Sequence, residues 1–114
     1  MYIGEAARKS GITIKAIRFY EATGLIKPPQ RSGRYRVYQQ QDIELLILIK
    51  EAKQLGITLS QLKPFIEYQQ GQLNWHKIKI FMLQTRQQLI ARIDDLKTRI
   101  EKIDQCCSQI NLQA

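Results

Sequence analysis

The chain has 114 residues and a formal net charge of +8, with 44% hydrophobic residues and two cysteines. This length suits one domain, or a small domain with an extended element, and the apolar content is sufficient for a core without disulfide or metal support. No run of eighteen apolar residues occurs and the start MYIGEAARKSG does not resemble a signal peptide. We therefore expect a cytoplasmic protein with reduced thiols and no membrane span.

The positive charge is concentrated in the first third of the chain. Residues 1–38 contain eight Lys or Arg residues and only Glu5 and Glu21 as acids, a balance of +6. Such a segment is typical of a protein that binds a polyanion such as DNA. The alternative is a solvated basic surface without a partner.

Two short helices separated by a glycine open the chain. Apolar residues at helical spacing over 3–10 predict the first helix, with Gly4 as its N-cap and Gly11 as its stop. Thr13 can cap a second helix, IKAIRFYEA, which ends before Gly24. Two helices joined by a turn of this kind predict a helix-turn-helix.

The same pattern recurs forty-five residues later. Gly11-Ile12-Thr13 is repeated as Gly56-Ile57-Thr58, after DIELLILIKEAKQL, which we interpret as a helix capped by Asp42. A repeated supersecondary unit predicts a second helix-turn-helix at about 43–69. Pro64 should kink or shorten its second helix.

The segment GLIKPPQRSGRYRVY, between the two copies, predicts a two-stranded wing. Leu25-Ile26 is interpreted as a short strand, Pro28-Pro29 as a stiff connection and Ser32-Gly33 as a turn. The alternating run RYRVY, residues 34–38, supplies a strand with two distinct faces.

One long helix without Pro or Gly is predicted from about Trp75 to Ile110. Its apolar residues alternate at spacings of three and four, which is typical of a coiled-coil seam. We therefore predict a winged helix-turn-helix domain over 1–70, and a dimerisation helix with a short tail over 71–114. The alternative is a helix that packs back along its own domain. The seam comprises Leu89, Ile93, Leu96, Ile100, Ile103 and Cys107.

The second helix carries candidate DNA-binding residues. Ile14 and Ile17 are expected to face inward, which leaves Lys15 and Arg18 on the outer face of a helix suited to the major groove. Arg18 can make bidentate contacts to guanine or phosphate, whereas Lys15 offers a point charge. Each could equally be a solvated surface cation.

The wing carries a second set of candidates. Arg34 and Arg36, with Arg31 at the base, suit the DNA backbone or the minor groove. Tyr35 and Tyr38 either place hydroxyls on phosphates or pack into the core with an exposed tip.

The sequence contains no set of residues that is typical of an active site. His76 is the only histidine, and neither a local Ser/His/Asp set nor a Gly-rich phosphate loop occurs. We expect the protein not to be an enzyme.

The run TIKAIRFYEATGLIKPP, followed by RYRVYQQQDIELL, resembles the MerR family of transcription regulators, and the resemblance continues through the long helix. It implies a mainly α fold in which the C-terminal helices pair as an antiparallel coiled coil in a homodimer. It also implies that an effector makes the dimer distort double-stranded promoter DNA, so that RNA polymerase meets the −35 and −10 elements in phase. The rival interpretation is an architectural or recombination-type DNA-bending factor without an effector.

Positions that match the family motif imply DNA contacts. The family wing usually has glycine directly before YRxY, whereas this chain has Arg34 there and Gly33 one step earlier. The implied contact residues are Thr13, Lys15, Arg18, Tyr20, Arg31, Tyr35, Arg36 and Lys53.

The adjacent residues Cys106 and Cys107 have three possible roles. Neighbouring residues on a helix point about 100° apart, so Cys107 fits the seam and Cys106 its flank. If the arms pair antiparallel, His76 of one subunit comes near the partner's Cys106 and the partner's Cys107, a donor set suited to Cu(I) or Zn²⁺. A thiol-oxidation sensor and purely structural cysteines are the alternatives.

Overall fold

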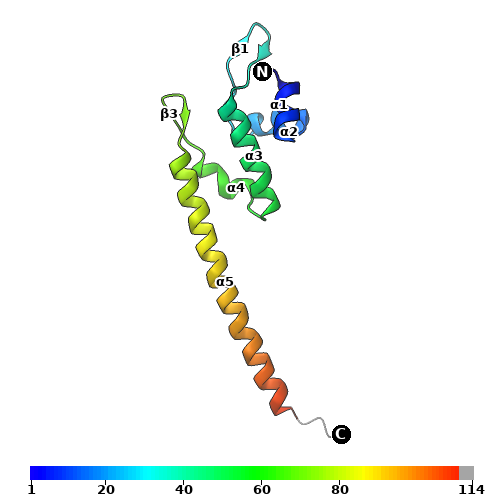
Figure 1. Cartoon of the computed structure of the whole chain (residues 1–114), viewed down its shortest axis with the longest axis vertical. Helices are drawn as coiled ribbons and strands as arrows, with labels where there is room; N and C mark the ends of the chain where they lie inside the picture. Colours follow the sequence, from blue (N-terminus) through cyan, green and yellow to red (C-terminus); the bar gives the residue numbers. More distant parts are fainter. Residues whose placement is uncertain (111–114) are drawn as a thin grey trace. The chain divides into compact units, whose positions relative to one another are not determined.

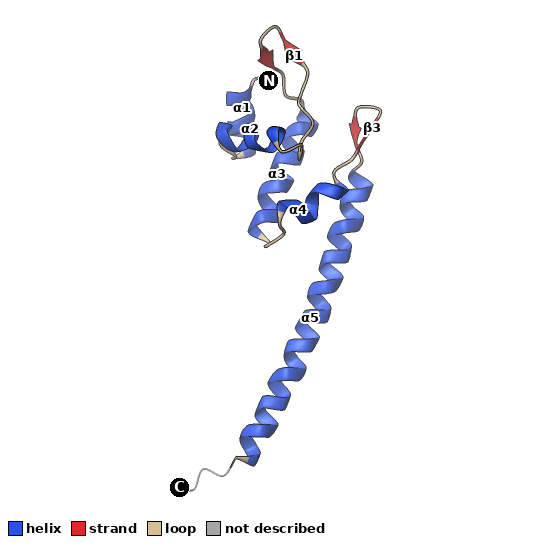
Figure 2. Cartoon of the chain, turned by 180° about the vertical axis from the view of Figure 1, so that it is seen from behind, coloured by secondary structure: helices blue, strands red, loops and turns tan. Residues whose placement is uncertain are grey.

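The computed structural model describes residues 1–110 and divides into two compact units, of which the first is Met1–Ile78 and the second begins at Lys79. The predicted fold is confirmed: a mainly helical chain with a two-stranded wing and a long C-terminal helix (Figure 2). The first turn of that helix belongs to the first unit, so this unit extends past the predicted boundary at residue 70. The predicted tail at 111–114 lies outside the described residues.

The first helix-turn-helix consists of α1 (Ile3–Ser10) and α2 (Ile14–Ala22) (Figure 1). Gly11 ends α1 in the left-handed conformation, with φ of 71°, which glycine adopts without steric strain. Thr13 caps α2 as predicted, because its hydroxyl accepts the backbone N–H of Ala16 at 3.1 Å.

Two predicted N-caps were wrong by a few residues. Tyr2, not Gly4, is the N-cap of α1, so Gly4 lies inside the first turn. The helix α3 (Gln40–Gln54) has Gln39 as its N-cap. Asp42 is the third residue of α3, where its carboxylate accepts the Gln39 backbone N–H at 2.8 Å. A carboxylate in the first helical turn satisfies a free N–H group as well as a cap does.

The wing is shorter than predicted. Its strands are β1 (Arg31–Ser32) and β2 (Tyr35–Arg36), and the turn between them is Gly33-Arg34 rather than Ser32-Gly33. The predicted strand at 25–26 was wrong, because the N–H groups of both residues point to the Tyr20 carbonyl and close the end of α2. These two residues are buried in the core instead.

The second helix-turn-helix joins α3 to α4 (Leu59–Leu62). Gly56 has φ of 80°, and the Thr58 hydroxyl accepts the Gln61 N–H at 3.2 Å. As predicted, Pro64 limits this helix, which continues only as the 3₁₀ turn η1 (Lys63–Phe65).

A second hairpin follows, which was missed at the sequence level: β3 (Tyr68–Gln69) pairs with β4 (Gln72–Leu73). Its turn has positive φ at both central residues, 52° at Gln70 and 77° at Gly71, as tight hairpin turns require. The signal that could have predicted this hairpin was Gly71, which lies between two short runs of polar and apolar residues.

The core of the first unit lies among α1, α2, α3 and α4. α1 packs against α2 and α3. Because α3 supplies buried residues at successive positions, it is enclosed on more than one side. The fully buried large side chains are Ile17, Tyr38, Leu45, Leu46, Ile49 and Leu62.

The helix α5 (Trp75–Gln109) agrees closely with the predicted long helix. Asn74 caps it by accepting the Lys77 N–H at 3.2 Å. Within residues 79–110, the predicted seam is exposed along its whole length. No helix among the described residues has the length and hydrophobicity needed to cross a bilayer.

Candidate nucleic-acid interface

The outer face of α2 presents two cations and an aromatic ring. Lys15 and Arg18 are exposed, and Phe19 beside them is 54% exposed. Ile14 was expected to face inward, but it is 38% exposed, whereas Ile12 just before the helix is buried. The face therefore combines positive charge with apolar surface, which suits contact with base edges and phosphates.

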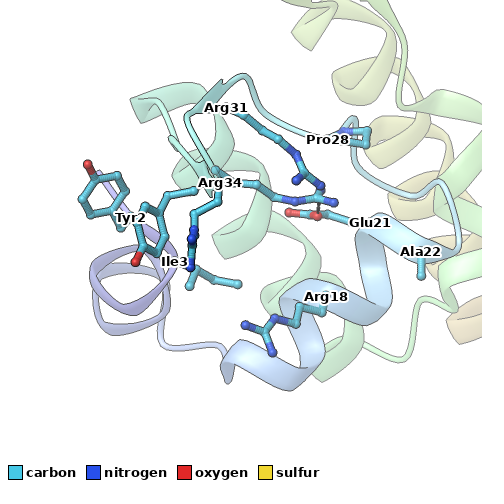
Figure 3. Close-up of a pocket in the computed structure, with 10 residues that line it drawn as sticks. Tyr2, Ile3, Arg18, Glu21, Ala22, Pro28, Arg31 and Arg34 are labelled. Atoms are coloured by element: carbon cyan, nitrogen blue, oxygen red, sulfur yellow. Dashed lines mark hydrogen bonds and ion pairs between the residues drawn. The ribbon is translucent and has the colours of Figure 1, made fainter.

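A pocket of about 430 Å³ lies between α1, α2 and the wing (Figure 3). Four arginines line it: Arg18 from α2, and Arg31, Arg34 and Arg36 from the wing. The structure thus gathers the predicted arginines around one opening. Among the described residues that line it, Glu21 is the one acid.

Glu21 is enclosed by the wing. Its two carboxylate oxygens accept separate hydrogen bonds, one from the Arg36 guanidinium and one from the Tyr38 hydroxyl. The Glu21 side chain is 6% exposed and the Arg36 side chain 31%. Burial, reinforced by the Glu21 carboxylate, raises the pKa of Tyr38, so its hydroxyl stays protonated and donates.

Tyr2 joins this site although the sequence analysis did not select it. Its ring lies 5.5 Å from the Tyr35 ring on the wing, at 46°, and both are exposed. The Tyr38 N–H donates to the Met1 carbonyl at 2.6 Å, which places the first residues alongside the wing. Met1 and Tyr38 are 37 positions apart, so no local sequence signal could have placed Tyr2 at this site.

Four predicted contact residues do not line the pocket: Thr13, Lys15, Tyr20 and Lys53. Tyr20 is only 4% exposed and packs in the core. The Thr13 hydroxyl is engaged in capping α2. Lys53 is exposed in the last turn of α3 and does not line the pocket.

The candidate metal ligands do not meet within one chain. Cys106 and Cys107 are free and exposed near the end of α5. His76 lies thirty residues before Cys106, which is about 45 Å along an α-helix. Within residues 1–110, no three His, Cys, Asp or Glu side chains are close enough to hold a metal ion. The donor types suit a soft ion, but one chain brings only the two thiols near each other.

Comparison with known proteins decides the family. The sequence model described as "MerR HTH family regulatory protein" matches residues 1–69, which is more than half of the chain. This chain belongs to the MerR family. The resemblance inferred from the motifs at residues 13–29 and 34–46 is thereby confirmed.

Full-length relatives support the assignment. An uncharacterized HTH-type transcriptional regulator of Synechocystis is 33% identical over 96% of this chain and 84% of its own length. The mercuric resistance operon regulatory protein of Bacillus cereus is 34% identical over 89% of this chain and 77% of its own. As predicted, this MerR-family chain is a transcriptional regulator and not an enzyme.

A solved structure supports the fold. The transcription regulator PbrR691 of Ralstonia metallidurans, in complex with lead(II), aligns with a TM-score of 0.54 at 20% identity, over 100% of this chain and 90% of that chain. At this identity the match concerns the architecture alone.

Proposed function

We propose that this MerR-family regulator binds promoter DNA by placing α2 in the major groove and the wing on the adjacent backbone. The observation that carries the proposal is the pocket where arginines of α2 and the wing converge. Separate elements that direct guanidinium groups to one opening are suited to neighbouring phosphates of one duplex. Anisotropy titrations with the protein's own promoter and with unrelated DNA test it; equal affinity for both would contradict it.

Individual roles follow from position. Arg18 and Lys15, on the exposed face of α2, are proposed to reach base edges and phosphates. Arg31, Arg34 and Tyr35 are proposed to contact the backbone beside the groove. The remaining proposed contacts are Thr13, through the N-terminal end of α2, and Lys53, at a neighbouring phosphate.

The long helix is proposed to dimerise. Leu89, Ile93, Leu96, Ile100 and Ile103 are exposed along one side of α5, and water contact with such a stripe is unfavourable. A parallel or antiparallel partner helix would cover it, and the family resemblance favours the antiparallel pair.

A charge in the seam tests the dimer. Ile100→Glu should convert the dimer to monomer in light scattering, because one glutamate per subunit would be buried without a partner. Gln105→Glu, an exposed position off the seam, is the matched control and should remain dimeric. An unchanged mass for Ile100→Glu would refute the seam.

We further propose that the bound dimer distorts the promoter, and that RNA polymerase is its partner there. Footprinting and transcription in vitro should place the site within the spacer between the −35 and −10 elements and show an effector-dependent change in transcript yield. A footprint elsewhere would favour the architectural factor. A regulator of this kind acts in the cytoplasm, where the promoter is.

A thiophilic metal, Cu(I) or Zn²⁺, is the proposed effector. Two exposed thiols near the end of α5 support it, together with a relative named for mercuric resistance. His76 of one subunit could complete a site with the partner's Cys106. Metal binding measured directly should weaken strongly in Cys106→Ser/Cys107→Ser and partly in His76→Ala. Unchanged binding in the cysteine variant would contradict the proposal, and a response to oxidants alone would favour a thiol sensor.

A further inference from the structure

Glu21 is an anomaly on a surface proposed to bind a polyanion. It projects from α2 toward the wing, and it lines the same pocket as Arg31 (Figure 3). A carboxylate in this position repels phosphate, so its placement needs a separate reason.

We infer that Glu21 is a positioning residue that clamps the wing to the recognition helix α2 through Arg36 and Tyr38, and thereby keeps the Arg36 charge away from DNA. The inference rests on the proposed DNA-binding function. It assigns Arg36, implied above as a DNA contact, to an ion pair within the protein, with 31% of its side chain exposed.

Burial is the first support for the clamp. A carboxylate that is 6% exposed is costly unless its oxygens are fully hydrogen-bonded, and here each oxygen has its own donor on the wing side. By contrast, Glu5 pairs with Arg8 and Lys9 at the surface at 3.9 and 3.6 Å, with nearly half of its side chain exposed. The two acids of this basic segment are thus in opposite environments.

The wing register is the second support. Arg31 and Arg36 are directly opposite each other across the hairpin. Like charges in this relation destabilise a two-stranded hairpin, which has little stability of its own. By neutralising Arg36, Glu21 removes that repulsion at the base of the wing.

The position of Tyr38 is the third support. Tyr38 is 1% exposed, and its backbone is hydrogen-bonded to Met1 through both its N–H and its carbonyl. Glu21 therefore joins α2 to β2 through Arg36. It also joins α2, through Tyr38, to the segment that follows the wing. Arg34 and Tyr35 directly precede the clamped arginine, so the clamp sets where they meet the DNA backbone.

The test is Glu21→Gln, which keeps the side-chain shape and removes the charge. Anisotropy titrations of the full-length protein with its promoter and with unrelated DNA should be repeated over a range of salt concentrations. The ratio of promoter affinity to unrelated-DNA affinity should fall by roughly tenfold, the scale of one lost specific contact. The slope of log affinity against log salt should steepen by about 0.9, because the released Arg36 can neutralise one further phosphate.

Glu5→Gln is the matched control, since it removes the same charge from an exposed ion pair of the same segment. It should leave both the ratio and the slope near their wild-type values. If Glu21→Gln behaves like Glu5→Gln while the wild type prefers its promoter, the clamp is refuted and the DNA-binding function stands. If the wild type itself shows no preference, the proposed function fails first.

A second variant covers the case in which Glu21→Gln does not fold. Arg36→Gln retains hydrogen-bonding capacity toward Glu21 and removes the positive charge. An unchanged salt slope would support an Arg36 that is withheld from DNA, whereas a slope shallower by about 0.9 would show a direct phosphate contact and overturn the inference.

Discussion

Gly11 and Gly56 open the turns of the two helix-turn-helix copies with φ angles of 71° and 80°. Ile12 and Ile57 are buried directly after them. Thr13 and Thr58 then cap the following helices by accepting an N–H three residues on, at 3.1 and 3.2 Å. The same three residue types therefore build the same backbone twice.

The likeness continues into the hairpins, where the sequences share little. Both have two-residue strands around a two-residue turn. Both are closed by one more backbone bond, Val37 N–H to the Gln30 carbonyl at 2.8 Å and Asn74 N–H to the Glu67 carbonyl at 2.7 Å. The structural repeat is thus helix, turn, helix, hairpin and helix, with α3 ending the first copy and beginning the second.

The copies differ in what they expose. The first has a nine-residue α2 and a wing rich in arginine, whereas the second has a four-residue α4 and the uncharged hairpin YQQGQL. The second hairpin is held to the start of α3: the Gln41 side chain donates to the Gly71 carbonyl at 3.0 Å and accepts the Leu73 N–H at 3.1 Å. The comparison teaches that the turn motif determines backbone geometry, while surface residues determine whether a copy is suited to DNA or to support.

The largest expected effect tests whether the copies are equivalent as folding units. Ile17 and Leu62 occupy matching positions and are fully buried. Ile17→Ala and Leu62→Ala should each lower the free energy of unfolding by about 2–5 kcal/mol, because each leaves a cavity. Chemical denaturation measures both; a cost below 1 kcal/mol for either would show that its copy is not part of the cooperative core.

The next effect separates the copies by function. Arg18→Ala should cost roughly 1–3 kcal/mol of promoter binding if Arg18 reads a base. Lys63 is the matching position in the second copy and donates to the Thr23 carbonyl at 2.7 Å, at the end of α2. Lys63→Ala should leave promoter affinity within a few-fold. If Arg18→Ala lost the same binding free energy on all DNA sequences, Arg18 would be a phosphate contact and not a base contact.

The capping threonines give a smaller, paired effect. Thr13→Ala and Thr58→Ala should each destabilise the protein by about 0.5–2 kcal/mol, since each frees one backbone N–H at a helix start. Thermal unfolding measures the pair. A loss of stability in one variant and none in the other would show that the two turns are not structurally equivalent.

The smallest effect concerns the start of α3, where the copies join. Burial raises the pKa of Asp42, although the Gln39 N–H opposes this. Because the folded state then holds its proton to higher pH than the unfolded state, stability should fall as pH rises from the ordinary value of 3.8 through the raised pKa. Asp42→Asn should remove this part of the pH dependence in melting curves. An identical profile in the variant would show that another group is responsible.

Short-range signals accounted for what could be predicted. Turn glycines, capping threonines, Pro64 and the three-four spacing of α5 act within a few residues, so the helices and both turns followed from them. The prediction for Ile14 was wrong because burial depends on the tertiary packing around a residue and not on helical spacing alone. The site was predicted as a set of basic residues with Thr13, Tyr20 and Tyr35, and this set did not include Glu21, which pairs with Arg36 and Tyr38.

The sequence by itself determined the family, the repeated turn, the basic first third and the apolar stripe of α5, since each depends on residue types at fixed spacing. Only the tertiary structure decided that Glu21 meets Arg36 and Tyr38, that Tyr2 lies against Tyr35, and that Tyr20 is buried. The first two relations join residues 15 to 33 positions apart, and burial depends on the whole core. Contacts of that range are selected by packing and by pairing of buried charge, which no local pattern encodes.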